Sequence, residues 1–301
     1  MVRIGVVLLP QERWATARSR WRAAEEMGFD HAWTYDHLAW RDLADEPWFA
    51  TVPLLAAAAA VTDRIGLGTW VASPNFRHPV PFAKDVMGLD DVSGGRFVLG
   101  VGAGGEGWDA GVLGPAPSRA ERTQRFAEFL GLLDKLLTQE VTDHDGAFYQ
   151  ARGARMVPGT IARPRTPFVV AANGPRAMAL AARYGQGWAT FGPGTGVGDG
   201  ADAAAAQEAW WDGLARMADA FDEASGGRDV GRWLSLDGAP RFSLTSAALA
   251  VEGVERAAAM GFGDVVVHWP RPSGVYAGDE RELERFAAEL PRLQALEPAA
   301  R

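Results

Sequence analysis

The residues best suited to acid–base chemistry are Asp36 and His37, two adjacent polar residues that directly follow a buried-type strand at 31–35. A carboxylate and an imidazole at such a position must find hydrogen-bonding partners or lose solvation, and histidine changes charge near neutral pH. His37 is therefore a candidate proton donor, and Asp36 is a candidate ligand contact. A structural histidine, with its hydrogen bonds made inside the fold, would show the same pattern. The pair alone therefore leaves a structural and a functional role open.

Two strand ends rich in glycine suggest a binding site. The apolar run at 65–71 and the apolar run at 97–101 both contain glycine, and a helix-sized segment separates them. Glycine lets a ligand approach the backbone closely, although a tight turn would explain either cluster alone. Two such clusters, each after a buried-type strand, favour a site. The residues that we assign to it are Trp70, Val71, Gly104, Gly105 and Glu106.

A third candidate is the segment 172–175, which precedes a helix-period stretch. It consists of Ala172, Asn173, Gly174 and Pro175. A proline at the first helical position leaves free amides beside it, and these amides with the helix dipole attract phosphate. A simple helix start fits the segment nearly as well.

Tryptophans supply the remaining candidates. Trp40 and Trp48 lie in the loop after the 31–35 strand, and Trp108 lies in the loop after the 97–101 strand. Trp40 and Trp48 are interspersed with charged residues in no helical period, which favours a pocket wall or lid over a packed helix face. We assign all three to substrate binding.

These residues need a scaffold that brings strand ends together. Eight buried-type strands alternate with helices along residues 1–301, which predicts a single (β/α)8 TIM barrel with loops inserted at its C-terminal face. A doubly wound open sheet is the rival, but it predicts a glycine-rich turn after the first strand, which here ends in Leu9-Pro10-Gln11. We predict that residues 138–163 are an excursion outside this repeat of strands and helices. At the opposite strand ends we expect ordinary solvated residues, including Asp30 and Asp264.

Composition narrows the class of protein. The chain has no cysteine, which excludes a disulfide framework and a zinc–thiolate site, and we assign no metal ligands. A net charge of −8 with only two lysines, Lys84 and Lys135, argues against a nucleic-acid partner. The longest apolar run, at 52–61, is too short to span a membrane, and no signal segment precedes the first strand. We expect a cytoplasmic protein.

The order and spacing of several short motifs resemble the luciferase-like flavin and deazaflavin oxidoreductases over nearly the whole chain. The motifs are Gly28-Phe29-Asp30 followed by Asp36-His37, Leu67-Gly68-Thr69, Arg77-His78-Pro79, Gly94-Gly95-Arg96 with Leu99-Gly100-Val101-Gly102, and Ala172-Asn173-Gly174-Pro175. The last motif is similar to the branch that uses coenzyme F420, whereas members that use FMN more often have a serine-rich turn there.

The resemblance implies roles for the candidates. Asp36 and His37 would lie at the deazaflavin ring, with His37 as proton donor, and the Trp70–Val71 bond would be a cis peptide behind the ring. The other cofactor contacts would be Gly104, Gly105 and the segment 172–175. Some members of the family have a catalytic glutamate after this glycine pattern, and Glu106 stands one position later than that glutamate. We take Glu106 with His37 as the candidate acids, and Asp109 or water as the next candidates.

We therefore expect an F420-dependent oxidoreductase that transfers a hydride between deazaflavin C5 and a small organic substrate of imine, alcohol or carbonyl type. No lysine occurs in 191–202, where relatives that oxidise sugar phosphates have one, so such a substrate is disfavoured. The alternatives are a two-component FMN monooxygenase and a flavin-binding barrel without turnover. The alanine-rich helix predicted at 51–62 suggests a homodimer, because small side chains permit close helix contact.

Overall fold

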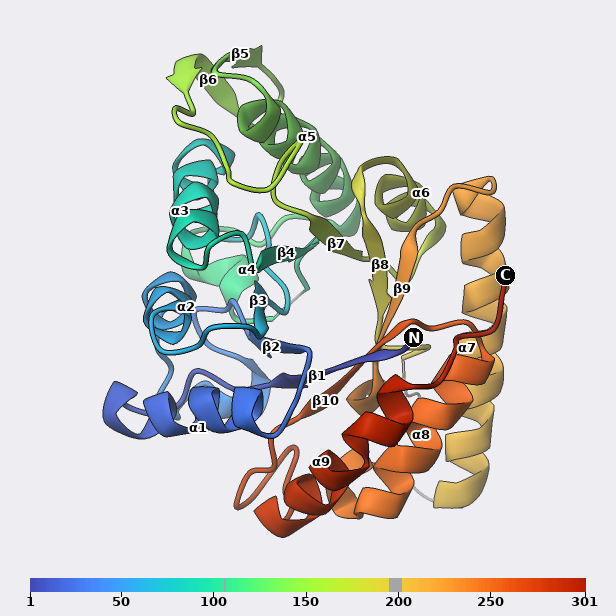
Figure 1. Cartoon of the computed structure of the whole chain (residues 1–301). Coiled ribbons are helices and arrows are strands. Elements are labelled where there is room, and N and C mark those ends of the chain that lie inside the picture. Colours follow the sequence, from blue (N-terminus) through green and yellow to red (C-terminus); the bar gives the residue numbers. More distant parts are fainter. Residues whose placement is uncertain (106, 195–201) are drawn as a thin grey trace.

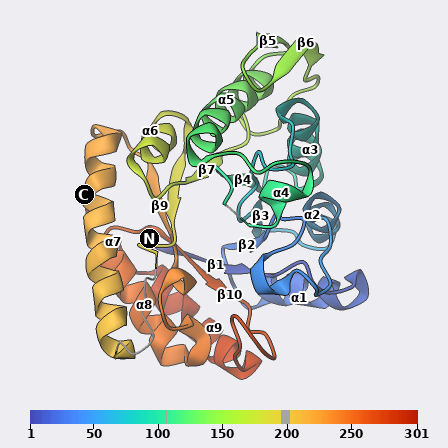
Figure 2. The same ribbon diagram turned by 180° about the vertical axis from the view of Figure 1, so that it is seen from behind.

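A computed structural model describes residues 1–105, 107–194 and 202–301. Parallel strands form a closed barrel in the order β1-β10-β9-β8-β7-β4-β3-β2, and helices surround it (Figures 1 and 2). The barrel strands are β1 (Arg3–Val7), β2 (His31–Thr34), β3 (Gly66–Thr69), β4 (Phe97–Gly102), β7 (Phe168–Ala171), β8 (Gly187–Thr190), β9 (Gly231–Ser235) and β10 (Asp264–His268). The (β/α)8 prediction is confirmed.

The helix predicted at 51–62 is present, and helices connect the barrel strands. They are α1 (Trp14–Glu26), α2 (Thr51–Ala59), α3 (Pro79–Val92), α4 (Asp109–Val112), α5 (Arg119–Thr138), α6 (Pro175–Tyr184), α7 (Ala203–Ser225), α8 (Ala247–Ala259) and α9 (Glu280–Gln294), with short 3₁₀ turns η1 (Arg41–Leu43), η2 (Leu236–Gly238) and η3 (Ser243–Thr245). Ser118 and Glu121 form a capping box at the start of α5. Within the described residues, no helix is long and apolar enough to cross a membrane.

Glycine occupies three helix-to-strand joints, and two of them share the same backbone conformation. Gly28 and Gly261 have φ of +92° and +84°, the left-handed conformation in which glycine carries no steric penalty. Gly185, at the third joint, has extended backbone instead, and a Cβ there would lie 2.7 Å from the carbonyl oxygen of Ala181. Close packing, rather than turn geometry, requires glycine at this third joint.

The excursion outside the repeat is an antiparallel hairpin, β5 (Val141–Asp145) with β6 (Gln150–Arg155), beside α5 at the top of Figure 1. Glu128 of α5 holds the hairpin turn, because its carboxylate accepts from the backbone nitrogens of Phe148 and Tyr149 at 3.1 and 2.8 Å. The hairpin is remote from the carboxyl ends of the barrel strands in both ribbon views.

The barrel interior is filled by aromatic side chains and closed at its amino end. Trp33 donates from Nε1 to His31 Nδ1 at 2.6 Å, and His31 Nε2 lies 3.2 Å from Asp264 Oδ1. Arg3 also bonds Asp264, at 2.9 Å. Asp264 is only 3% exposed, so the prediction of an ordinary solvated residue was wrong there. A carboxylate with two cationic or polar partners can remain buried, and single-sequence patterns do not reveal such partners.

Candidate active site

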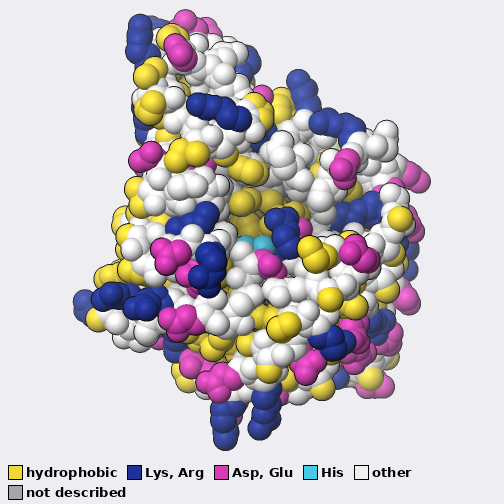
Figure 3. All heavy atoms as spheres, in the orientation of Figure 1, with side chains coloured by type: hydrophobic (Ala, Val, Ile, Leu, Met, Phe, Trp, Pro, Cys, Tyr) yellow, Lys and Arg dark blue, Asp and Glu magenta, His cyan; other side chains and the backbone are white. Residues whose placement is uncertain are grey.

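The molecule is hollowed near the centre of the space-filling view (Figure 3), where hydrophobic side chains form the floor and a histidine lies at the edge. In the matching ribbon view the hollow falls between α4 and β7. The predicted site residues belong to segments that follow β2, β3, β4 and β7, four adjacent strands of the barrel. Their carboxyl ends meet at one face, so the scaffold brings most of the candidates together.

His37 is held by a partner that sequence reasoning left as a secondary candidate. Its Nδ1 lies 2.5 Å from Asp109 Oδ2, and Asp109 Oδ1 accepts from the backbone nitrogen of Leu38 at 2.8 Å. Asp109 is 3% exposed, whereas the His37 side chain is 25% exposed. Because a carboxylate can only accept, His37 carries its hydrogen on Nδ1. Its Nε2, which has no hydrogen-bond partner among the described residues, is left for a ligand.

Asp36 occupies a different environment from its neighbour. It is 1% exposed, and its two oxygens accept from Nε and Nη2 of Arg77 at 2.9 and 2.6 Å. Arg77 also packs over the rings of Phe76 and Phe82. Such a bidentate pair is geometrically specific, so Asp36 fixes the loop after β2 to the loop after β3. Both oxygens of Asp36 are bonded to Arg77, and its contact with the cofactor stays a prediction.

The Trp70–Val71 peptide bond is cis, as the resemblance implied. Trp70 is buried against Trp33, with ring centroids 5.0 Å apart. The glycines of β4 make room for this segment: a Cβ at Gly100 would lie 1.9 Å from the carbonyl oxygen of Thr69, and one at Gly102 would lie 2.9 Å from Val71 Cγ2. These glycines are therefore required by packing between β3 and β4.

The loop after β4 is tied to Asn75. Gly104 has φ +78°, and a Cβ there would lie 2.6 Å from Asn75 Oδ1. The carbonyl oxygen of Gly105 accepts from Asn75 Nδ2 at 3.3 Å. Glu106 lies outside the described residues. Trp108 is 58% exposed, in contrast to Asp109 beside it, so its contact with a substrate remains a prediction.

The segment after β7 begins with two residues that are bonded within the fold and ends at the uncapped start of a helix. Ala172 is buried, and its carbonyl oxygen accepts from Trp188 Nε1 at 2.7 Å. Asn173 bridges to the end of β8, donating to the carbonyl oxygen of Gly192 at 2.8 Å. Gly174 precedes α6 without a side-chain cap, Pro175 begins the helix, and a Cβ on Gly174 would meet no atom within 4 Å. This helix end has no side-chain cap, and its contact with a cofactor phosphate stays a prediction.

Aromatic rings form one wall of the site. Trp48 donates from Nε1 to the carbonyl oxygen of His37 at 2.8 Å, and Trp40 stacks on Tyr276 with centroids 6.1 Å apart. Tyr35 contacts both His37 and Trp40 by edge-to-face packing, at 5.9 and 5.1 Å. Trp40 and Trp48 were predicted here. Tyr276 was missed, because it follows a different strand and no spacing in the sequence connects it with them.

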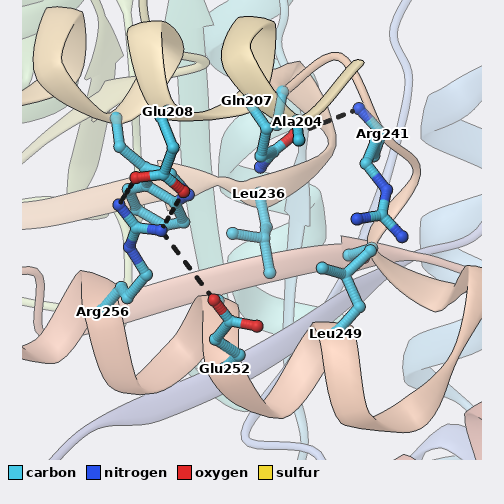
Figure 4. A pocket seen from close by; sticks show the side chains of 12 residues that line it. Ala204, Gln207, Glu208, Leu236, Arg241, Leu249, Glu252 and Arg256 are labelled. Carbon is cyan, nitrogen blue, oxygen red and sulfur yellow. Dashed lines mark hydrogen bonds and ion pairs between the residues drawn. The ribbon is translucent and has the colours of Figure 1, made fainter. Parts of the chain in front are cut away.

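A separate cavity of about 130 Å³ lies between α7 and α8 (Figure 4). Three of its four charged side chains bond one another: Arg256 donates to both oxygens of Glu208 at 2.7 and 2.8 Å and lies 3.8 Å from Glu252. Arg256 also packs over the ring of Trp211. Because these three charges are paired and the fourth, Arg241, is exposed to solvent, we assign no ligand to this cavity.

The fold and the gathering of polar and aromatic residues at the carboxyl ends define a (β/α)8 barrel of the kind that enzymes use. A family model described as luciferase-like monooxygenase matches residues 2–228, and the chain belongs to this family.

Relatives and solved structures agree with that assignment. The chain is 34% identical to the F420-dependent glucose-6-phosphate dehydrogenase of Beutenbergia cavernae, over 91% of this chain and 92% of that protein. It is 34% identical to the 4-hydroxyprotoasukamycin monooxygenase of Streptomyces nodosus subsp. asukaensis, over 60% of this chain and 51% of that protein.

In structure, the chain is similar to the coenzyme F420-dependent tetrahydromethanopterin reductase of Methanopyrus kandleri, with a TM-score of 0.74 and 16% identity over 97% of this chain and 99% of that chain. An F420-dependent secondary alcohol dehydrogenase gives a TM-score of 0.76 at 16% identity, with the same coverage. At this identity, the two structures support the fold.

Proposed function

We propose that the chain is an F420-dependent oxidoreductase that transfers a hydride between deazaflavin C5 and a small imine, alcohol or carbonyl compound. The observation that carries the proposal is the His37–Asp109 pair, which leaves Nε2 of His37 open at a face enclosed by aromatic rings. Relatives named for F420-dependent dehydrogenation support the choice of cofactor.

The residues at this face fit such a cofactor. Val71, Gly104 and Gly174 follow β3, β4 and β7, which are neighbours in the barrel, so they can border one elongated ligand. The uncapped amides at the start of α6 and the open space at Gly174 suit a phosphate group. When bound there, the deazaflavin supplies the group that accepts or donates a hydride.

The protein's own residues would then orient the reactants and handle the proton. Asp109 keeps His37 in the Nδ1–H tautomer, so Nε2 can take a proton from a substrate hydroxyl, or return one to a carbonyl oxygen in the reverse direction. Trp40 and Trp48 would exclude water from the substrate. Asp36 and Arg77 position the loop that carries His37.

We do not extend the glucose 6-phosphate specificity of the Beutenbergia relative to this chain. A sugar phosphate needs cationic contacts, and 191–202 contains no lysine, although residues 195–201 lie outside the described part of the structure. The aromatic wall of Tyr35, Trp40 and Trp48 favours a less polar substrate instead.

A two-component FMN monooxygenase is the second candidate, and the Streptomyces relative favours it. Titration of the protein with F420 and, separately, with FMN tests the choice through the absorbance of each cofactor. We expect F420 to bind at least tenfold more tightly, a difference of about 1.4 kcal/mol. Equal or tighter binding of FMN would remove the F420 assignment, and binding of neither cofactor would remove both candidates.

We further propose a cytoplasmic homodimer. In α2, Ala58 and Ala59 are buried within the protein, whereas Ala56 and Ala57 are partly exposed and Ala60 is exposed just after the helix. These exposed alanines leave small side chains for contact with a second copy of the chain. Light scattering across micromolar concentrations tests the dimer, and a monomer mass throughout would reject it.

A further inference from the structure

A second hydrogen-bonded chain of acid–base groups lies inside the barrel mouth, and the mechanism above does not use it. It links Asp237, His268, Tyr35 and Tyr276. Asp237 lies in η2 after β9, His268 ends β10, Tyr35 follows β2, and Tyr276 lies in the loop after β10. The first three side chains are buried, whereas Tyr276 is half-buried.

The hydrogen bonds in this chain have a defined direction. Asp237 Oδ2 lies 2.9 Å from His268 Nδ1 and also accepts from the His268 backbone nitrogen at 2.7 Å. Because the carboxylate can only accept, His268 carries its hydrogen on Nδ1, and Nε2 accepts from the Tyr35 hydroxyl at 2.7 Å. Tyr35 has one proton to donate, so its oxygen accepts from the Tyr276 hydroxyl at 2.8 Å.

We propose that this chain is a proton relay, in which Tyr276 exchanges a proton with the substrate and His268 holds it. The proposal rests on the oxidoreductase function proposed above. During alcohol oxidation His37 then only orients the substrate hydroxyl through a hydrogen bond to its Nε2, and the hydroxyl proton passes to Tyr276 instead. The Tyr276 proton passes to Tyr35, and the Tyr35 proton passes to His268 Nε2. Three O–H bonds break while two O–H bonds and one N–H bond form, and the deazaflavin takes the hydride. Carbonyl reduction reverses every transfer.

The protonation properties of the four groups suit these roles. Burial, followed by the neighbouring Tyr276, raises the pKa of Tyr35 well above its ordinary value, and burial raises the pKa of Tyr276 to about 12. Each phenol therefore gives up a proton only as it receives another. His268 can hold a positive charge, because the Asp237 carboxylate faces its Nδ1. Two charged groups act on both phenols: the Asp237 carboxylate adds to the rise in each pKa, and the Arg41 guanidinium opposes it in part.

The backbone at Tyr276 gives independent support. Its φ is +60°, a left-handed conformation that costs a non-glycine residue about 1 kcal/mol or more and often marks functional sites. Arg271 holds the loop in place: its backbone nitrogen donates to the Tyr276 carbonyl oxygen at 2.8 Å, and its Nη2 lies 2.5 Å from Glu46 Oε2. The ring then stacks on His268, with centroids 3.9 Å apart.

The substitution Tyr276→Phe tests the relay, and Tyr149→Phe is its matched control. Burial also raises the pKa of Tyr149 to about 12, but its ring packs against Phe129 and His78 and against no residue of the relay, and its hydroxyl has no partner in the described part of the chain. The first measurement is ¹⁵N NMR of the His268 ring in protein without cofactor. We expect Tyr276→Phe to shift the Nε2 resonance and Tyr149→Phe to leave it unchanged. An unchanged resonance in Tyr276→Phe would overturn the relay.

The second measurement is turnover with F420, in H₂O and D₂O, of the compound that wild-type protein uses best. We expect Tyr276→Phe to slow turnover by about 10²-fold and to change the solvent isotope effect, with F420 affinity within about twofold of wild type. Tyr35→Phe should cause a similar loss, and the double variant little more, because both changes break one chain.

The outcomes separate the relay from a structural network and from the proposed function. Wild-type turnover and isotope effect in Tyr276→Phe would identify the chain as structural and overturn the relay, even with a shifted His268 resonance. Failure of the oxidoreductase function would show instead as wild-type protein that binds no F420. In that case the relay as stated is overturned with it, and the NMR result reports only whether the two residues are coupled.

Discussion

Two of the histidine–aspartate pairs of the barrel, His31–Asp264 at the amino end and His37–Asp109 at the carboxyl end, are connected differently. At the amino end, both ring nitrogens of His31 are engaged, one by Trp33 and the other by Asp264, and the pair is buried. At the carboxyl end, Asp109 engages one nitrogen of His37, and the imidazole remains partly exposed. The same two residue types therefore close the barrel at one end and present an acid–base group at the other. In these two pairs the difference is the contact of the second ring nitrogen, which is a protein donor for His31 and is left open in His37.

The largest expected effect on stability is at the amino end. Asp264→Ala removes the acceptor of the buried His31 Nε2–H group and a partner of Arg3, and leaving a buried donor without an acceptor costs about 1–3 kcal/mol, with the exposed Arg3 adding little. We expect urea unfolding to show this loss and titration to show unchanged F420 affinity in the folded protein. A loss below about 1 kcal/mol would contradict the structural role of the pair.

Substitution of the carboxyl-end histidine should act on turnover instead. We expect His37→Ala to slow turnover by about 10²-fold or more, equivalent to about 2.7 kcal/mol in the barrier, while stability and F420 affinity change modestly. Steady-state kinetics with urea unfolding on the same samples measure both. Normal turnover with bound cofactor would make His37 structural and move the proton donor elsewhere, with Tyr276 and Asp109 as the next candidates.

Most of the fold could be predicted from the sequence, because each βα unit has its own local pattern. The strand predicted at 31–35 is β2, the apolar run at 97–101 falls in β4, and the helix predicted at 51–62 contains α2. The departures come from tertiary packing. Gly185 is a glycine because a side chain would contact Ala181, and Asp264 is buried because Arg3 and His31 meet it.

The candidate site was predicted only where local sequence or the family resemblance carried it. His37, Trp40 and Trp48 follow a recognisable strand, and the cis bond at Trp70 came from the resemblance. Partners distant in sequence could not be found in this way. Asp109 is 72 residues from His37, and no periodicity connects them. The same reason explains why the pairing of Asp36 with Arg77 and the place of Tyr276 in the wall were missed.

Two glycines of one segment provide a smaller test of how packing and openness differ at the carboxyl end. A Cβ at Gly100 would lie 1.9 Å from the Thr69 carbonyl oxygen, whereas the nearest atom to a Cβ at Gly105 is the Gly107 nitrogen at 3.9 Å. We expect Gly100→Ala to destabilise the fold by about 1–3 kcal/mol, because backbone cannot yield as a flexible side chain can. Gly105→Ala should change stability by about 0.5 kcal/mol or less. Thermal unfolding of the two variants measures the difference, and equal stabilities would show that β3 does not constrain β4.

The smallest expected effect concerns alkaline pH. Burial raises the pKa values of Tyr276 and Tyr149 from 10.0 to about 12. Between these values the unfolded chain has lost the proton and the folded chain has kept it, so stability falls as pH rises. Denaturant midpoints measured from about pH 9 to about pH 12 should fall less steeply in Tyr276→Phe and in Tyr149→Phe. An unchanged slope in both variants would contradict these raised pKa values.

The central claim is that the carboxyl end of the barrel carries out hydride transfer with a deazaflavin, and transfer of label tests it most directly. Protein loaded with reduced F420 that carries deuterium at C5 is mixed without oxygen with a panel of small imines and carbonyl compounds, and the products are analysed by mass spectrometry. The account predicts deuterium on the reduced carbon of the product, with its formation slowed in His37→Ala. Product without deuterium, or product that forms only when oxygen is admitted, would contradict it.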